Sequence, residues 1–337
     1  MKKYTIFISF FSLILFFGFM SNDVMAEKKA RNDYTFGEIE QMLVKYLDNN
    51  GYHLEIGTPE FTDFVNKQML YDADQKLANL SEYHLFVAYF AEYLHRLTLF
   101  ETELMSEYDS FTYSTDLSNT DKTILEISGE KFSMSNLKDI TLGEMEEEIL
   151  QEENELAKLQ EIKQLNPELM AVNTINITKA RAYATKFYNS FNGLYPKYSA
   201  DCTNFVSQIL EAGGKKQVSP GTVTTLVYDT KYWFVQKRYS DAVWTRSTSW
   251  TVVEDLYKHL YRNHATYTST SKKNIVAQAK TGDVIQFKKP GAQRFSHSMW
   301  VYTKYDGDIA LSGHSDPALT KRLTYITSFT TFRIIKM

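Results

Sequence analysis

The sequence is poor in cysteine: Cys202 is the only one among 337 residues. An internal disulfide is therefore excluded, and a lone cysteine in an oxidising space either pairs with another molecule or remains a reactive thiol. Histidines are few as well, and in the first half His53, His84 and His95 are not grouped with other ligands at metal spacing. Internal repeats and low-complexity segments are also missing. We expect neither a metal nor a cofactor.

Long apolar runs are missing after the first 26 residues. At the start, Lys2-Lys3 precede an almost wholly apolar run over residues 6–20, and Val24-Met25-Ala26 forms a small-x-small cleavage site. This pattern is typical of an export signal and is short for a membrane span. We predict cleavage after about Ala26, which makes residues 1–26 a signal peptide and the product a secreted protein without a stable membrane span. A retained N-terminal anchor is the alternative.

The net charge of −4 hides an imbalance between two halves. Residues 27–172 carry 30 acidic and 12 basic residues, a net charge of −18. Residues 173–337 carry 10 acidic and 23 basic residues, a net charge of +13. The halves could attract each other inside the molecule, or the basic half could be drawn to an anionic polymer such as a Gram-positive wall carrying phosphates.

The first half is predicted to be mainly helical. Apolar residues at helical spacing predict helices over residues 36–47, 58–70, 83–104 and 144–169. Between them, residues 111–132 intersperse Thr and Ser with apolar residues, which predicts two or three antiparallel strands with a turn at Ser128-Gly129.

We therefore expect an acidic helix-and-strand domain of unknown role over residues 27–140 and a charged linker helix over residues 141–172. No loop in the Glu-rich linker arranges carboxylates around calcium, and we expect no nucleic-acid partner.

The residues around Cys202 predict a helix that begins at the cysteine. Ser199 or Asp201 can cap its start, and Gly213-Gly214 ends it. Its apolar residues recur at helical spacing: Phe205, Val206, Ile209 and Leu210. A cysteine in the first turn meets free backbone N–H groups and the positive end of the helix dipole, which favour the nucleophilic thiolate. The alternative is a small buried hydrophobe.

Asp201-Cys202-Thr203-Asn204-Phe205-Val206-Ser207-Gln208 resembles the nucleophile segment of the bacterial putative amidase domain family. That family looks like a branch of the NlpC/P60 and CHAP group of papain-like cysteine hydrolases acting on cell walls. The resemblance extends over about residues 177–332 and includes Gly282-Asp283, similar to the Gly-Asp turn of NlpC/P60 enzymes. It implies an α+β, papain-like (NlpC/P60-like) amidase domain over residues 173–337.

The resemblance also implies roles for individual residues. Cys202 would attack an amide carbonyl, and His297, which begins the strand after the Gly-Asp turn, would take the thiol proton. The backbone N–H of Cys202 should contribute to the oxyanion site. In NlpC/P60-like enzymes a tyrosine ahead of the cysteine helps bind the oxyanion, and aromatic residues either line a peptide groove or belong to the core. The candidates for oxyanion or substrate binding are Asp201, Tyr195, Tyr198, Trp233 and Trp250.

The group that orients His297 is predicted from a hairpin. A two-residue turn at Asp306-Gly307 sets a register in which His297 faces Asp316. In this register His314 is the diagonal neighbour of His297, and all three side chains project from one face. NlpC/P60-like enzymes commonly use a histidine on the second strand, which favours His314 as the third catalytic residue. Asp316 is the alternative, and a bulge at Gly313 would shift the register by one residue.

The expected function is a secreted or wall-associated cysteine amidase or endopeptidase, with peptidoglycan or another anionic wall polymer as its partner. Two alternatives remain open. One is a non-catalytic relative that only binds wall fragments, and the other is an exported cysteine peptidase or transferase acting on a protein.

Overall fold

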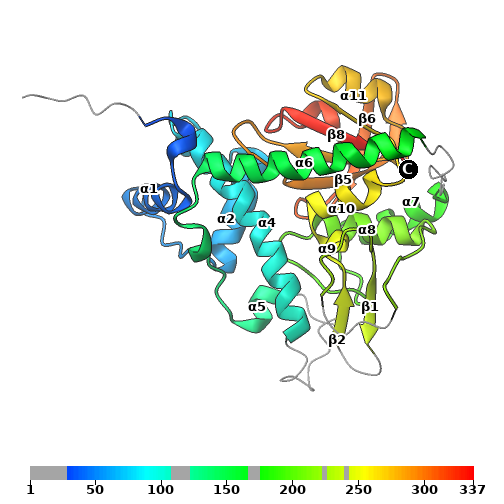
Figure 1. The fold of residues 1–337 in the computed structure, drawn as a ribbon, viewed down its shortest axis with the longest axis horizontal. Helices are drawn as coiled ribbons and strands as arrows, with labels where there is room; N and C mark the ends of the chain where they lie inside the picture. The colour runs from blue at the N-terminus through cyan, green and yellow to red at the C-terminus, as the bar shows by residue number, and fades with distance from the viewer. Residues whose placement is uncertain (1–28, 108–121, 166–174, 222–225, 239–242) are drawn as a thin grey trace, which may run out of the picture.

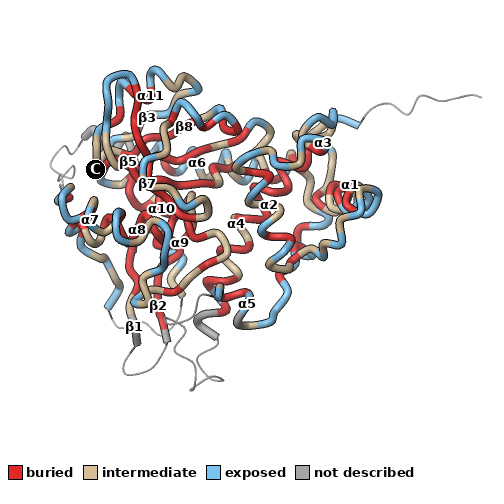
Figure 2. Tube along the Cα trace, turned by 180° about the vertical axis from the view of Figure 1, so that it is seen from behind, coloured by how far each residue is buried: buried red, intermediate tan, exposed pale blue. Residues whose placement is uncertain are grey.

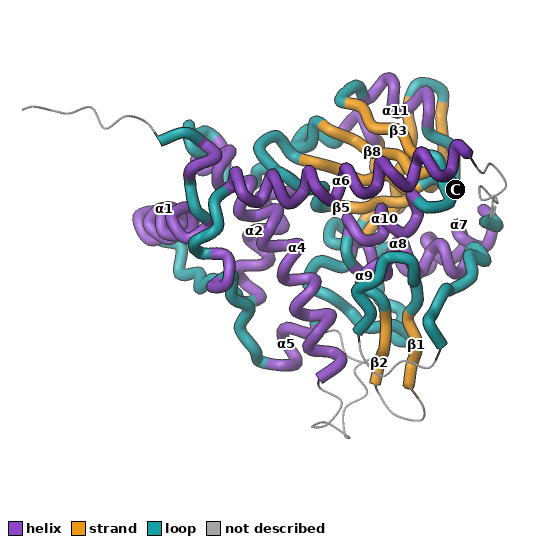
Figure 3. Tube along the Cα trace, viewed as in Figure 1, coloured by secondary structure: helices purple, strands orange, loops and turns teal. Residues whose placement is uncertain are grey.

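The computed structural model describes residues 29–107, 122–165, 175–221, 226–238 and 243–337 (Figure 1). The chain is α+β, as expected, with a helical N-terminal half beside a C-terminal half built on an antiparallel sheet (Figure 3). The predicted signal peptide lies outside the described residues. Among the described residues, no helix combines the length and apolar character needed to cross a membrane.

The N-terminal half packs its helices around one long central helix. The helices are α1 (Phe36–Asn49), α2 (Pro59–Tyr71), α3 (Gln75–Ala78), α4 (Tyr83–Glu107), α5 (Ile124–Ser128) and α6 (Leu142–Leu165). The predictions of α1, α2 and α4 are confirmed, and α6 confirms the last predicted helix as far as Leu165, while its role as a linker stays a prediction. A capping box of Thr35 and Glu38 starts α1, and Thr58 caps α2. The residues of α4 from 85 to 91 are all buried, which makes α4 the core of this half (Figure 2).

The strands predicted between residues 111 and 132 are wrong where the structure describes this segment. Residues 124–128 form helix α5 because Thr123 and Glu126 make a reciprocal capping box. Gly129 ends the helix in the left-handed conformation, with a φ of 65°. Residues 108–121 lie outside the described residues. In the described part of the N-terminal half, the only β pairing is the isolated bridge between Thr35 and Thr141.

The C-terminal half is built on a six-stranded sheet in which all neighbouring strands are antiparallel. Its spatial order is β3 (Thr266–Ser269), β8 (Thr331–Ile335), β4 (Val284–Lys288), β5 (His297–Tyr305), β6 (Asp308–Gly313) and β7 (Ala318–Arg322). A separate hairpin pairs β1 (Val235–Arg238) with β2 (Val243–Arg246). The helices are α7 (Ile177–Phe187), α8 (Cys202–Ala212), α9 (Thr248–Thr251), α10 (Val253–Tyr261) and α11 (Lys272–Gln278).

The two faces of the sheet contribute to separate apolar clusters. Trp300 of β5 packs with α7, α8 and α10 on one face. Met299 and Val301 of the same strand pack with α11 on the other. Because side chains alternate along a strand, a shift of one residue would move a side chain from one cluster to the other. The register of β5 therefore decides which residues can reach Cys202 at the start of α8.

The β5–β6 hairpin has the predicted turn but not the predicted register throughout. Tyr305 pairs with Asp308 around the Asp306-Gly307 turn, as expected. The register then shifts between Val301 and Thr303, so that Trp300 pairs with Ser312. The irregularity therefore lies at Tyr302 of β5, not at Gly313 in this pairing, and every pair beyond it is displaced by one residue.

Ion pairs join the acidic half to the basic half. Arg294 contacts Glu92 of α4 at 3.0 Å and Glu152 of α6 at 3.0 Å. Lys258 contacts the same Glu152 at 3.0 Å. The charge imbalance seen in the sequence thus has partners within the chain, and binding of an external anionic polymer stays a prediction.

Candidate active site

Cys202 is the first residue of α8 and is only 3% exposed. Burial raises the pKa of its thiol. A hydrogen bond from the backbone of Ser298 and another from the Thr203 hydroxyl lower that pKa, but their effect is smaller. The expectation that the helix start favours thiolate is therefore overruled in this conformation, because desolvation of the charged form is the larger effect. The resting thiol is protonated.

The thiol lines a cavity of only about 20 Å³ between the two halves. The C-terminal half contributes Cys202, Ala200, Thr251, Val252, Val253, Phe295 and Ser296, and α4 contributes Ala91, Leu94, His95 and Thr98. A cavity of this size holds about one water molecule. The nucleophile candidate is thus enclosed by a helix of the acidic half.

Asp201 and His314 form a buried pair beside Cys202. The Nδ1 atom of His314 lies 2.7 Å from Oδ2 of Asp201, and its Nε2 lies 2.7 Å from the carbonyl oxygen of Phe187. Both partner oxygens are hydrogen-bond acceptors, so the ring is held at both of its nitrogens. The ring stacks on Phe205 of α8 with centroids 3.8 Å apart. His314 therefore lies on the face of the sheet that carries Cys202.

His297 lies on the opposite face of the sheet. Its ring packs against Phe287 and Phe329, members of the cluster under α11. The neighbouring residue faces α8 instead: Oγ1 of Thr203 donates to Oγ of Ser298 at 3.1 Å. Among the described residues, no hydrogen bond joins His297 to Cys202. The predicted sharing of one face by His297 and His314 is thus wrong, because the register shift at Tyr302 displaces the two strands by one residue.

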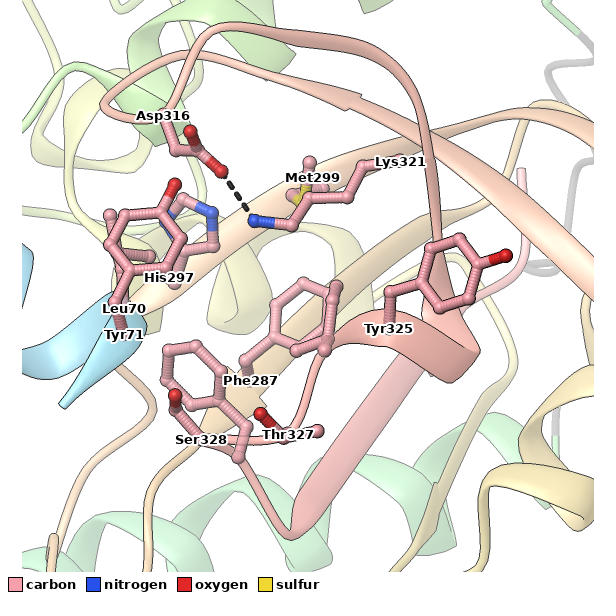
Figure 4. Close-up of a pocket in the computed structure, with 12 residues that line it drawn as sticks. Leu70, Tyr71, Phe287, His297, Met299, Asp316, Lys321, Tyr325, Thr327 and Ser328 are labelled. Atoms are coloured by element: carbon pink, nitrogen blue, oxygen red, sulfur yellow. Dashed lines mark hydrogen bonds and ion pairs between the residues drawn. The ribbon is translucent and has the colours of Figure 1, made fainter.

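His297 and Asp316 do lie together, in a pocket of about 180 Å³ on that opposite face (Figure 4). Figure 4 shows Asp316 paired with Lys321 beside the His297 ring, and the two charged atoms are 2.5 Å apart. Burial, and then the Lys321 charge, lower the pKa of His297 to about 4. His297 is therefore neutral at physiological pH. Asp316 cannot orient a base for Cys202 from this position.

The aromatic candidates mostly build the core around α8. Trp233 and Trp250 are fully buried, and their indole N–H groups donate to Ser207 and Asn204 of α8. They do not line a groove. The Tyr195 hydroxyl donates to Glu211 at 2.6 Å, which holds it away from the thiol.

Tyr198 is the other tyrosine considered for the oxyanion site. Its hydroxyl is buried without a hydrogen-bond partner among the described residues. Its backbone N–H donates to Oδ1 of Asp201 at 3.1 Å, and Asn204 donates to the same oxygen. Asp201 is therefore a positioning residue in this structure, bonded to the preceding loop, to α8 and to His314.

Three residues around the cavity that Cys202 lines were not predicted from the sequence. His95 of α4 lines it, Glu101 of α4 is bonded to Ser199, and Arg294 precedes the lining residue Phe295. Burial lowers the pKa of His95 and raises that of Glu101 to about 7. Glu101 accepts hydrogen bonds from the N–H and hydroxyl of Ser199, three residues before Cys202. No local motif around these residues indicates chemistry, so only their tertiary contacts identify them.

Comparison with known proteins identifies the C-terminal half. Residues 174–335 match the family model described as "Putative amidase domain". This part of the chain belongs to that family. Cys202 and His314 both lie within the matched residues. The description of that family suggests amide hydrolysis for this part of the chain.

A curated relative of the chain is "Uncharacterized protein YhbB" of Bacillus subtilis (strain 168). The two are 31% identical over 129 residues, which is 38% of this chain and 37% of the relative. The match therefore spans little more than a third of that relative's length. No solved structure matches the chain significantly.

Proposed function

We propose that the protein is a secreted cysteine amidase that hydrolyses amide bonds of bacterial peptidoglycan, with a papain-like (NlpC/P60-like) catalytic domain. The family match supports amide hydrolysis. The observation that carries the cysteine mechanism is the position of Cys202, the only cysteine, at the first turn of α8 beside a buried histidine–carboxylate pair. The sequence features of an export signal support a target outside the cell.

In this proposal His314, and not His297, is the acid–base residue, and Asp201 orients it. A carboxylate bonded to Nδ1 leaves Nε2 as the atom that exchanges protons with a nucleophile, as in other catalytic triads. In the described conformation Nε2 is bonded to the carbonyl of Phe187, so this contact must be released before the imidazole can serve Cys202. Catalytic hydrogen bonds are often made only in the substrate complex.

The reaction follows from these roles. The Sγ–H bond of Cys202 breaks, its proton passes to Nε2 of His314, and sulfur bonds to the amide carbonyl carbon. The backbone N–H of Cys202 stabilises the resulting oxyanion. The C–N bond then breaks as the imidazolium protonates the departing amine. Water attacks the thioester carbonyl carbon and gives a proton to Nε2 of His314. The C–S bond then breaks, the imidazolium returns the proton to the sulfur of Cys202, and a carboxylic acid is released.

Digestion of purified peptidoglycan, followed by mass spectrometry of released fragments, tests the proposal. Cys202→Ser and His314→Ala should each lower the rate by about 100-fold or more, and His297→Ala should change it by only a few-fold. Full activity of Cys202→Ser would overturn the cysteine mechanism. Loss of activity in His297→Ala but not in His314→Ala would return the base to His297. Failure to release any fragment, while a protein substrate is cleaved, would replace the wall by a protein target.

A further inference from the structure

One face of α4 forms a wall of the cavity that holds the thiol. Ala91, Leu94, His95 and Thr98 line it, at the spacing of neighbouring residues on one helix face. The remaining volume of about 20 Å³ has no room for a peptide amide and its flanking atoms. Hydrolysis at Cys202 therefore requires that α4 first move away.

Buried carboxylates hold α4 on both sides of this cavity. On one side Glu92 pairs with Arg294, and both side chains are at most 3% exposed. On the other side Glu101 accepts from the backbone N–H of Ser199 at 3.0 Å. The two glutamates are nine residues apart, which corresponds to about 13.5 Å along the helix axis and about half a turn around it, so they leave α4 on opposite sides. Ordinary apolar packing of a helix would not require a desolvated carboxylate at either end.

Arg246 supplies a second, independent observation. This arginine is 1% exposed, and one of its nitrogens donates to the backbone carbonyl of Thr102 on α4. Its Nε and Nη1 atoms are buried without a hydrogen-bond partner among the described residues. A buried guanidinium with unused donors is suited to a carboxylate, which it can bind with two parallel hydrogen bonds.

We propose that α4 occupies the substrate groove of the amidase, and that the groove binds a peptide with carboxylates on both sides of the scissile amide. Arg294 binds one carboxylate, and the Ser199 N–H with Arg246 binds the other. An axial separation of about 13.5 Å equals about four residues of extended chain, so the two acidic residues stand at least four positions apart. The acidic half thus keeps the enzyme latent by taking the place of its substrate. This inference rests on the proposed function of Cys202.

A disulfide between α4 and α9 tests the occlusion directly. The hydroxyl oxygens of Thr102 and Thr251 are 3.2 Å apart, so cysteines at both positions are within bonding reach. In the full chain carrying Thr102→Cys and Thr251→Cys, peptide mapping verifies the link and quantifies iodoacetamide modification of Cys202. Oxidised protein should react at least about 10-fold more slowly than reduced protein. Equal rates would overturn the occlusion, because the thiol would then be reached without movement of α4.

A second variant loosens the helix instead of locking it. Glu92→Gln removes a charge that holds Arg294 and should speed alkylation of Cys202 by about 10-fold. Asp63→Asn is the matched control, because Asp63 pairs with Lys67 on the exposed surface of α2. Circular dichroism verifies that both variants are folded. An unchanged alkylation rate in folded Glu92→Gln would contradict the role of this carboxylate. If the variant does not fold, the alkylation rates of the oxidised and reduced disulfide variant decide whether α4 covers Cys202.

The substrate class is tested by protection of Cys202 in the Glu92→Gln protein. The probe is a five-residue peptide with glutamate at both ends and alanines between, compared with the same peptide carrying glutamines. The glutamate peptide should slow alkylation, and Arg294→Gln should abolish this effect. Equal behaviour of the two peptides would overturn the carboxylate assignment. Alkylation does not depend on hydrolysis. If Cys202→Ser remained active, the proposed cysteine mechanism would fail, but the alkylation results would still test the position of α4.

Discussion

The buried carboxylate of Glu101 makes the stability of the protein depend on pH in a defined direction. Its pKa is raised from 4.5 to about 7, first by burial and with a further contribution from the nearby Asp201 charge. Hydrogen bonds from Ser199 and Leu125 oppose the rise. The native state therefore binds the proton more tightly than the unfolded chain. The stability that this proton contributes is full below about pH 4.5 and is lost as the pH rises to about 7.

The size of the effect follows from the two pKa values. A rise from 4.5 to about 7 corresponds to about 3 kcal/mol at 1.36 kcal/mol per pH unit. Other carboxylates also titrate in this range. The quantity to measure is therefore the difference in unfolding free energy between the unsubstituted protein and Glu101→Gln, in which residue 101 cannot titrate. Between pH 4.5 and 7.5 the unfolding free energy of the unsubstituted protein should fall by about 3 kcal/mol relative to that of the variant.

Urea denaturation of both proteins at a series of pH values, monitored by tryptophan fluorescence, measures this difference. Glu60→Gln serves as a control, because Glu60 is an exposed carboxylate on α2 of the same half. The difference in unfolding free energy between Glu60→Gln and the unsubstituted protein should vary much less with pH. The raised pKa of Glu101 would be refuted if the unfolding free energy of the unsubstituted protein, relative to that of Glu101→Gln, stayed constant or increased as the pH rises.

Three further outcomes are expected. Because burial raises the thiol pKa, iodoacetamide at pH 8 should modify Cys202 in the folded chain at least about 10-fold more slowly than in urea, as measured by mass spectrometry. Gly57→Ala should lower the unfolding free energy by more than about 2 kcal/mol, because its φ is +90° and a Cβ would lie 1.9 Å from the Phe132 carbonyl oxygen. At Gly51, where φ is +72° but nothing lies within 4 Å, the same change should cost about 1 kcal/mol, and equal losses would contradict the packing at Gly57. Trp250→Phe should cost about 1–3 kcal/mol in the same assay, because it leaves the Asn204 side chain without its indole donor, and an unchanged stability would contradict that bond.

Local features of the chain were predictable because their physical causes are local. The start of α8 at Cys202 follows from the apolar spacing behind it and the glycines after it. The Asp306-Gly307 turn was correct for the same reason, since two residues determine the type of turn. The helix at residues 124–128 was missed although its capping pair, Thr123 and Glu126, is present in the sequence. The apolar and hydroxyl residues of this segment are typical of a strand, but the capping box stabilises a helix more strongly.

The candidate site depended on contacts that no local pattern contains. One extra residue at Tyr302 in β5 places His297 and His314 on opposite faces of the sheet, and it is His314 that is bonded to Asp201, the residue before Cys202. Strand register has a period of two, so a single displaced residue reverses which face a side chain occupies. The charge of each half was readable from the sequence, as was the solitary cysteine. That α4 covers this cysteine was decided only by packing, because residues 91–98 and Cys202 are more than a hundred positions apart and meet only when the two halves fold against each other.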